Sequence, residues 1–465
     1  MTRFNLCYII KLKIEVINKN QQRKSKEGRC PNDRKETRMK KLLVSLLALA
    51  MTTSLVACGG GKADTEKTGD NELEAELEYW SSWSETENQA LALQEAAKRF
   101  TEENPGVKIN FTFNGRDNRN LVGSAVAAGT KVTMMDANAD NVESMWSDMI
   151  LDLTPYFEKE YSFTNGEKYV DSIMEPMANL SKDLFDGKYS YFPYAPQAFM
   201  VFCNKTLLEE CGVTEYPTTW EEFLAVCEKV KAKGYIPVST DTNYSTSWVG
   251  YYMSRLLGNE TVEKLSKDSS AWSDPKVLEA AKAIEDMASK GYFDPSIESN
   301  IYPNAQQAMV IDGKIAMYIN GTWLPNEVSV TTPEDYKWGA FAFPAVDGGV
   351  DDQTSGCFSS YGIAINKDAT PEEAEAAAAF GVYVTTEFDQ QFSDMTNAIP
   401  VSNTGVWPEN LKDAQVVLNG YTNRYPSQTA ITMNSNSKQI ISDACLKLMG
   451  GSINAEEFVK MASKF

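Results

Sequence analysis

The segment from Ala75 to Phe113, AELEYWSSWSETENQALALQEAAKRFTEENPGVKINFTF, sets the fold of this chain. Leu77 and Tyr79 alternate with charged residues, which predicts a half-buried strand that ends at Trp80-Ser81-Ser82-Trp83. Ser84 to Glu87 has the form of a capping box, so a helix is expected directly after the strand. One face of that helix is apolar, and the breaker Asn104-Pro105-Gly106 ends it. A second strand follows, with alternating apolar residues Val107, Ile109, Phe111 and Phe113.

The same order of elements repeats once more. A short helix is predicted over residues 118–128, ending at Gly129, and a third strand over residues 132–136. Strands that alternate with helices favour an α/β fold with a parallel sheet covered on both faces. Ligands of such sheets bind beyond the carboxyl ends of the strands. Here those ends are predicted at residues 80–83, 114–119 and 136–140.

The remainder of the chain continues the mixture of strands and helices. An extended stretch is expected at residues 189–204, and further strands at residues 235–239, 312–323 and 361–365. Thr219 and Glu222 form a second capping box, and Thr370-Pro371 begins an alanine-rich helix. Helices are predicted at residues 219–234, 274–291, 370–384, 437–449 and 454–465.

Residues 39–57 have the pattern of a secretory signal peptide. Basic residues follow Met39, an apolar run comes next, and Leu55-Val56-Ala57-Cys58 resembles the lipobox of bacterial lipoproteins. We therefore expect Cys58 to be lipidated and residues 58–74 to form a flexible tether outside the cytoplasm. Residues 1–38 are interpreted as a non-native extension, with translation starting at Met39. The alternative is a basic cytoplasmic tail on an uncleaved anchor.

Composition excludes several classes of protein. The 465 residues carry a net charge of −20, which disfavours binding to nucleic acid. The chain contains no histidine, so catalytic triads that need histidine and the usual zinc sites are excluded. Of the eight cysteines, five follow the lipobox, and whether Cys203 and Cys211 pair is left open. About 400 residues after the signal exceed one ordinary core, so two lobes are expected.

Four stretches resemble the extracellular solute-binding proteins of bacterial ABC importers, in the family that includes maltose-binding protein. The lipobox is the first, and the segment from Trp80 to Val107 is the second. The other two are FCNKTLL (residues 202–208) with PTTWEEF (217–223), and GKIAM (313–317) with NGTW (320–323). Two departures are Cys203, where the family usually has Tyr, and Met135-Asp136 in place of Pro-Asp.

The resemblance implies a two-lobed α/β fold of the type II periplasmic-binding-protein kind, with the ligand in a cleft between the lobes. Lobe 1 would comprise residues 75–196 and 350–395. Lobe 2 would comprise residues 197–349 and 396–465. The chain would leave lobe 1 near Gln197, return near Gly356 and cross again near Thr396.

The resemblance also implies ligand-binding residues. The family places a stacking Trp at the position of Trp323, after Gly321, and a cleft carboxylate at the position of Gln197. A flat aromatic side chain can stack on the apolar face of a sugar ring, while polar neighbours bind its hydroxyl groups. A structural Trp in the core is the alternative.

Other candidates come from the predicted strand ends and loops. Carboxylates, amides and hydroxyls there can bind hydroxyl pairs, although Asp136 to Asp140 also suits a helix cap. Arg116 and Arg119 can bind a carboxylate such as a uronic acid, or form a solvated face. The additional predicted ligand-binding residues are Ser81, Ser82, Trp83, Asp136, Asn138, Asp140, Asn243, Trp248, Phe358 and Ser359.

The sequence therefore predicts a lipid-anchored, extracellular protein that binds a sugar or oligosaccharide and delivers it to the permease of an ABC transporter. No catalytic residues, cofactor or metal are expected, and a monomer is expected from the family alone. Lobe closure around the ligand would be the mechanism. Two alternatives stay open: a lipoprotein glycoside hydrolase with two facing carboxylates, and a binding protein for a peptide, polyol or glycerol phosphate.

Overall fold

The fold is described by a computed structural model, which covers residues 73–426 and 429–465. Cys58, the signal segment and residues 1–38 lie outside these residues. In the described part of the chain, no helix combines the length and the apolar character that a membrane crossing requires.

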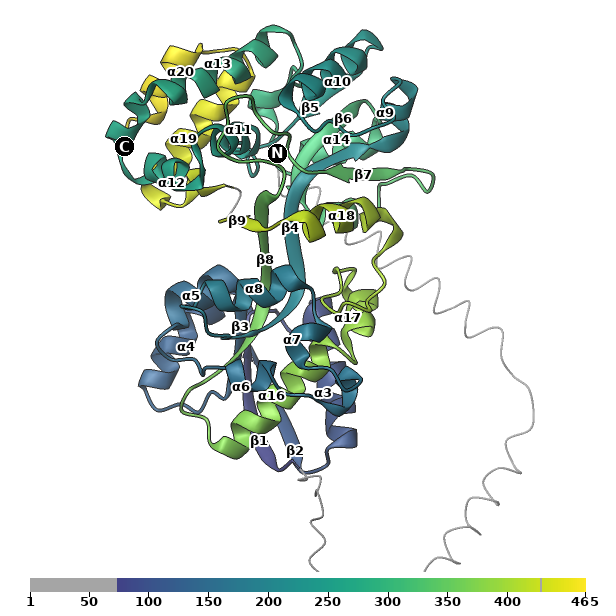
Figure 1. The fold of residues 1–465 in the computed structure, drawn as a ribbon, viewed down its shortest axis with the longest axis vertical. Helices are drawn as coiled ribbons and strands as arrows, with labels where there is room; N and C mark the ends of the chain where they lie inside the picture. Colours follow the sequence, from purple (N-terminus) through teal and green to yellow (C-terminus); the bar gives the residue numbers. More distant parts are fainter. Residues whose placement is uncertain (1–72, 427–428) are drawn as a thin grey trace, which may run out of the picture. The chain divides into compact units, whose positions relative to one another are not determined.

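A mixed sheet organises the first lobe (Figure 1). The strands β1 (Ala75–Ser81), β2 (Val107–Phe113) and β3 (Met134–Asn138) are parallel, with Leu77 opposite Ile109 and Tyr79 opposite Met134. This confirms the predicted parallel order, although β3 lies two residues later than expected. β8 (Ser355–Ile365) is antiparallel to β3. The helices of this lobe are α3 (Asn88–Glu103), α4 (Asn118–Ala127), α5 (Ala139–Trp146), α6 (Thr154–Phe157), α7 (Tyr169–Ser172), α8 (Glu175–Asp183), α16 (Pro371–Thr385) and α17 (Asp389–Thr396).

One strand, β4 (Phe192–Asn204), belongs to both lobes. Its first half pairs with β8, and its second half, Phe199–Asn204, pairs with β6 (Ile315–Gly321) and β7 (Trp338–Phe341). The register shifts between Tyr194 and Gln197, where Ala195 has a positive φ of 48°. This irregularity lies where the strand passes from one lobe to the other, and β4 and β8 together form the ribbon that joins the lobes (Figure 1).

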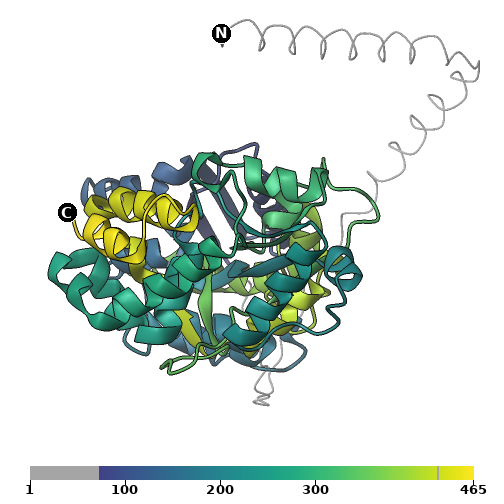
Figure 2. The same cartoon turned by 90° about the horizontal axis from the view of Figure 1, so that it is seen from above.

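The second lobe surrounds β5 (Ile236–Ser239), β6 and β7. The C-terminal helices pack against α13, beside the other helices of this lobe (Figure 2). α18 (Lys412–Gly420) and β9 (Asn423–Tyr425) lie next to the ribbon. The remaining helices are α9 (Lys205–Glu210), α10 (Trp220–Ala232), α11 (Ser247–Leu257), α12 (Asn259–Lys267), α13 (Pro275–Ser289), α14 (Asn304–Ile311), α15 (Leu324–Glu327), α19 (Ser435–Met449) and α20 (Ala455–Ala462).

Two local predictions differ from the structure. Ser84 does not cap α3, because the chain first makes a turn and the helix begins at Asn88, with Glu87 at the cap position. The third crossing also lies later than residue 396. Ser402 still pairs with Ile173, and the N–H of Val401 donates to Asp389, so this segment remains on the first lobe. The predicted capping box of α10 is confirmed, and α16 begins at Thr370-Pro371 as expected, there with a capping box of Thr370 and Glu373.

Candidate functional site

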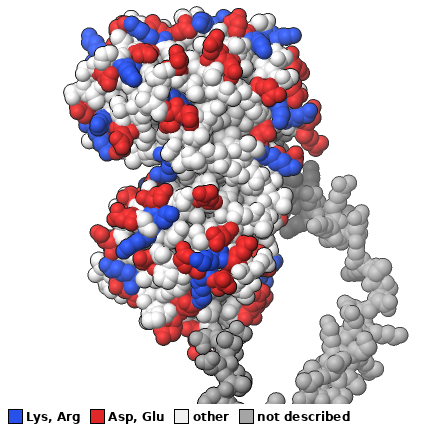
Figure 3. All heavy atoms as spheres, viewed as in Figure 1, with Lys and Arg blue, Asp and Glu red and all other residues white. Residues whose placement is uncertain are grey.

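The carboxyl ends of the strands border a narrow cleft between the lobes. Its volume is about 70 Å³, and it is lined by Trp83 of the first lobe, Gln197 of β4, Trp323 of the second lobe and residues 396–399. Sites for small molecules usually enclose ~300–1,000 Å³. The cleft must therefore widen before it can hold a sugar. Charged side chains cover both lobes, whereas the waist between them carries few on the face seen in Figure 3.

Trp323 is the aromatic side chain with the most suitable position. It is half-buried, its Nε1–H donates to the Tyr244 hydroxyl at 3.2 Å, and its ring meets Phe199 edge to face at 4.9 Å between centroids. A Cβ atom at Gly321 would lie 2.3 Å from the Trp323 ring. The Trp323 indole therefore packs directly against Gly321, and any side chain at residue 321 would displace the ring. The structure places Gly321 under Trp323.

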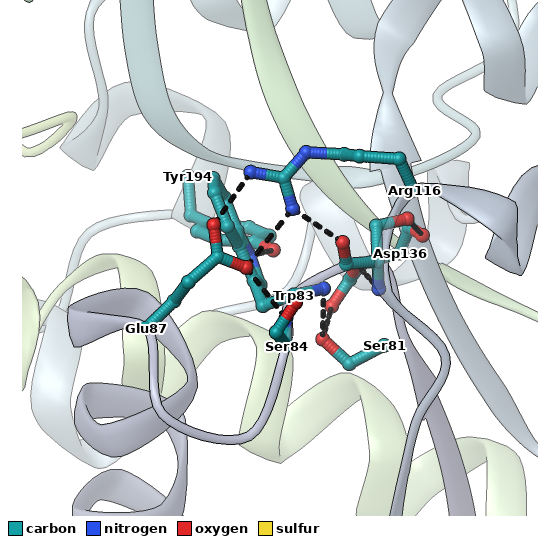
Figure 4. A network of polar contacts seen from close by, with 8 residues as sticks. Ser81, Trp83, Ser84, Glu87, Arg116, Asp136 and Tyr194 are labelled. Carbon is teal, nitrogen blue, oxygen red and sulfur yellow. Dashed lines mark hydrogen bonds and ion pairs between the residues drawn. The ribbon is translucent and has the colours of Figure 1, made fainter. Parts of the chain in front are cut away.

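Trp83 lines the cleft but is almost completely buried. The Tyr361 ring lies 4.4 Å from the Trp83 ring. The Arg116 guanidinium lies 4.3 Å from the Trp83 ring centroid (Figure 4). The indole N–H donates to the Tyr194 hydroxyl at 2.7 Å. The engaged N–H and the burial leave little of the Trp83 ring accessible in this arrangement, and direct contact of Trp83 with a sugar stays a prediction.

Arg116 already has a carboxylate partner. Its Nη2 lies 2.9 Å from Glu87 Oε1, and its Nη1 donates to the backbone oxygen of Ser82 (Figure 4). An acidic sugar would have to displace Glu87 to reach this guanidinium. Arg119 is exposed on α4.

Asp136 joins the ends of β1 and β3 from inside the fold. Its carboxylate accepts from the Tyr79 hydroxyl (2.8 Å), the Ser81 hydroxyl (2.8 Å) and the Ser82 backbone N–H (2.7 Å). Burial raises the pKa of Asp136, and these donors act in the opposite direction. Asp136, Ser81 and Ser82 are all buried, so the predicted direct contact of these three residues with a ligand does not fit. They support the floor of the cleft.

Asn138, Asp140 and Ser359 are half-buried at the top of β3 and on β8. Asn138 caps α5 by accepting from the Asp140 backbone N–H, and it also accepts from the Ser359 hydroxyl at 3.3 Å. Ser359 is the cross-strand partner of Gln197. The carboxylate of Asp140 forms an ion pair with Arg424 of β9. Asn138 therefore acts as the cap of α5, and Asp140 ties this segment to β9.

Three of the predicted residues lie elsewhere. Trp248 is fully buried in α11, donates to the Ser239 carbonyl and stacks on Phe223, which makes it a core residue. Asn243 is exposed in a turn, where its backbone N–H donates to Asp241. Phe358 is buried against Tyr421. From this polar loop it is Tyr244, and not Trp248, that contacts Trp323.

Sequence reasoning missed Tyr244, Phe199, Tyr361 and Arg424. The first three lie in stretches rich in aromatic residues, where periodicity does not separate core from cleft. Arg424 lies in an irregular segment without a strand or helix pattern. No group of three or more Cys, Asp or Glu side chains is arranged to hold a metal ion within residues 73–426 and 429–465.

Comparison with known proteins places the chain among binding proteins. Residues 83–391 match the family of bacterial extracellular solute-binding proteins. A binding protein of Brucella abortus is 27% identical over 54% of this chain and 59% of its own length, so the chain spans little more than half of that relative. The multiple sugar-binding protein of Streptococcus mutans is 25% identical over 78% of this chain and 83% of its own length. A solved chitin oligosaccharide binding protein has the same fold, with a TM-score of 0.59, 22% identity, and 84% and 98% of the two chains covered.

Proposed function

Since this chain belongs to the bacterial extracellular solute-binding proteins, we propose that it binds a sugar or oligosaccharide and delivers it to an ABC transporter. The observation that carries the proposal is the position of Trp323, whose indole packs against Gly321 and lines the cleft. Gln197 and Ser359 supply polar groups on the adjoining wall. An aromatic face beside amide and hydroxyl groups suits the apolar and polar sides of a sugar ring.

Calorimetric titration of the chain with α-glucan, xylan and chitin oligosaccharides tests this proposal. We expect one series to bind and Trp323→Ala to weaken that binding about 10- to 100-fold, as loss of a central aromatic contact does. Trp323→Phe keeps an aromatic face and should retain most of the affinity. Binding of peptides or glycerol phosphate, with no heat from any carbohydrate, would disprove the sugar proposal.

Catalysis is not part of the proposal. The family consists of substrate-binding proteins, and the cleft requires only widening and closure around the ligand. Chromatography of the bound oligosaccharide after prolonged incubation should show it unchanged. Shorter products would support the alternative, a glycoside hydrolase.

The proposal extends to the location of the protein. Residues 39–57 and Cys58 would place it, lipid-anchored, at the outer face of the cell membrane, near a permease and as a monomer. Labelling with radioactive palmitate should mark the wild-type chain, and Cys58→Ala should remove the label and release the protein from the membrane. Light scattering on the released protein tests the monomer.

A further inference from the structure

A second cavity, here called the hinge cavity, lies beside the ribbon of β4 and β8. It encloses about 360 Å³, much more than the cleft that holds Trp323. Its walls are α8 of the first lobe, Phe358 of β8, and the segment Asn419–Arg424 that ends α18 and forms β9. This volume falls in the range of small-molecule sites.

The hinge cavity and the cleft lie on opposite faces of the ribbon. Ser359 is the cross-strand partner of Gln197, and Phe358 is the partner of Ala198. Successive side chains of a strand point to opposite faces, whereas direct cross-strand partners share a face. Gln197 lines the cleft and Phe358 lines the hinge cavity. The hinge cavity is therefore a separate space and not an extension of the cleft.

One face of α8 presents a column of polar groups to the hinge cavity. Glu175, Asn179 and Asp183 recur every four residues, which places them on one side of the helix, and all three line the cavity. Asn419 faces them from the end of α18. Within the described residues, the side chains of these four have no hydrogen-bond or ion-pair partner, so their donors and acceptors remain available to a ligand.

Apart from the Thr422 hydroxyl, the remaining lining is apolar or already engaged. Leu180, Leu184 and Phe358 are apolar, and the Tyr421 hydroxyl donates to the Phe199 carbonyl. Arg424 is engaged by Asp140 and by the Phe358 carbonyl. The two carboxylates of α8 thus face the cavity without an uncommitted cation, which disfavours anionic ligands.

We infer that the hinge cavity binds a neutral, polyhydroxylated molecule of about monosaccharide size. Carboxylate oxygens accept from hydroxyl groups, and the Asn179 and Asn419 amides both donate and accept, which matches paired hydroxyls. The apolar lining of Phe358 and the leucines suits the C–H face of such a molecule. The inference does not depend on the sugar proposed for the cleft, since no residue lines both spaces.

The test uses the full chain carrying Trp323→Ala, which removes the proposed cleft contact and leaves the hinge cavity intact. Sorbitol and D-glucose are titrated and followed by saturation-transfer NMR. We expect saturable binding of one of them, weakened at least tenfold when Asn179→Leu is added. Asn120→Leu, an exposed asparagine of α4 outside the cavity, is the matched control and should change nothing.

Three results would overturn the inference: no saturable binding of either probe, equal binding with and without Asn179→Leu, or binding of spermidine in preference to both. Circular dichroism of each variant shows that it is folded. Failure here is distinct from failure of the proposed function, because oligosaccharide binding by the wild-type chain is measured separately and depends on Trp323. Asp183→Leu, which removes the hydrogen-bonding groups of that side chain, provides a second cavity variant with the same expected loss.

Discussion

At the scale of single residues, Gly321 and Trp323 form one unit. Gly321→Ala would place a Cβ 2.3 Å from the indole ring, so the ring must move. We expect a stability loss of about 1–2 kcal/mol from overpacking and a sugar affinity about tenfold lower. Chemical denaturation and calorimetry measure the two effects. Unchanged affinity with a displaced ring would show that the indole does not stack on the ligand.

Gly123 provides the control for this prediction. It lies inside α4, and a Cβ there meets nothing within 4 Å. Gly123→Ala should leave sugar binding unchanged and stabilise the protein by about 0.5–1 kcal/mol, because alanine loses less entropy in a helix. Denaturation of the two glycine variants side by side separates steric displacement from backbone entropy.

Asp136 and Asp140 are close in sequence but should respond differently to substitution. Asp136→Ala leaves the Tyr79 and Ser81 hydroxyls without their buried acceptor, which should cost about 3 kcal/mol of stability. Asp140→Ala breaks a partly exposed ion pair and should cost about 1 kcal/mol or less. Urea denaturation distinguishes them. Similar losses for both would contradict the assignment of Asp136 to the support of the cleft floor.

At the scale of elements, the sequence predicted most helices and strands because their signals are local. A capping box lies within four consecutive residues, so it does not depend on distant parts of the chain. Such boxes form at Thr219 with Glu222 and at Thr370 with Glu373, and both helices begin where expected. At Ser84 only half of the pattern forms: the Glu87 carboxylate accepts from the Ser84 backbone N–H, but the helix begins at Asn88. Glu87 also pairs with Arg116, which comes from a different element. Tertiary contacts of this kind have no signature in the surrounding sequence.

The candidate site was predicted less well than the elements, for a related reason. A family motif located Trp323 and Gln197, and the structure brings both to the cleft. Burial decided the others: Trp248 lies on a helix face that points inward, and Asp136 lies beneath the strand ends. Whether a polar residue at a strand end faces the ligand or its neighbouring strand depends on partners far away in the chain.

The segment after α17 should make stability depend on pH. Asp389 is buried and accepts from the backbone N–H groups of Val401 and Ser402. Burial raises its pKa to about 7, and these hydrogen bonds act in the opposite direction. A carboxyl whose pKa is raised on folding stabilises the protein below the pKa of the unfolded chain, and this contribution is lost as pH rises to 7.

We therefore expect the contribution of Asp389 to decrease between about pH 4 and pH 7, by on the order of 3 kcal/mol. Asp389→Asn should abolish that part of the slope. The measurement is the difference in unfolding free energy between wild type and variant at several pH values. A constant difference from pH 4 to pH 8 would contradict the raised pKa. Residues 396–399 border the cleft, so ligand affinity should be measured in the same series.

At the scale of the whole molecule, the Asp140–Arg424 ion pair ties α5 of the first lobe to β9 beside the second. β9 is itself held by Tyr425, whose hydroxyl accepts from the buried Arg255. Arg424→Gln should favour separated lobes, since β9 then stays anchored to the second lobe through Tyr425 and Arg255 but loses its ion pair with the first lobe. We expect a larger radius of gyration in X-ray scattering and a ligand affinity about twofold to fivefold lower.

Salt provides a second measurement of the same contact. High ionic strength screens a partly exposed pair, so it should move the wild type toward the radius of the Arg424→Gln variant and leave the variant unchanged. Lys98→Gln, which breaks a pair inside α3, is the control. Equal radii for wild type and Arg424→Gln at low salt would show that the ion pair does not hold the lobes together.

The position of Trp323 also makes the protein its own optical probe. Its indole is half-exposed at the cleft, with the N–H bonded to Tyr244, so the polarity around the ring changes whenever a ligand replaces water. Trp248, fully enclosed in α11, keeps the same surroundings in every state of the cleft. Emission from Trp323 should shift to shorter wavelength on binding. Ligand arrival is thus readable by intrinsic fluorescence, without any attached dye.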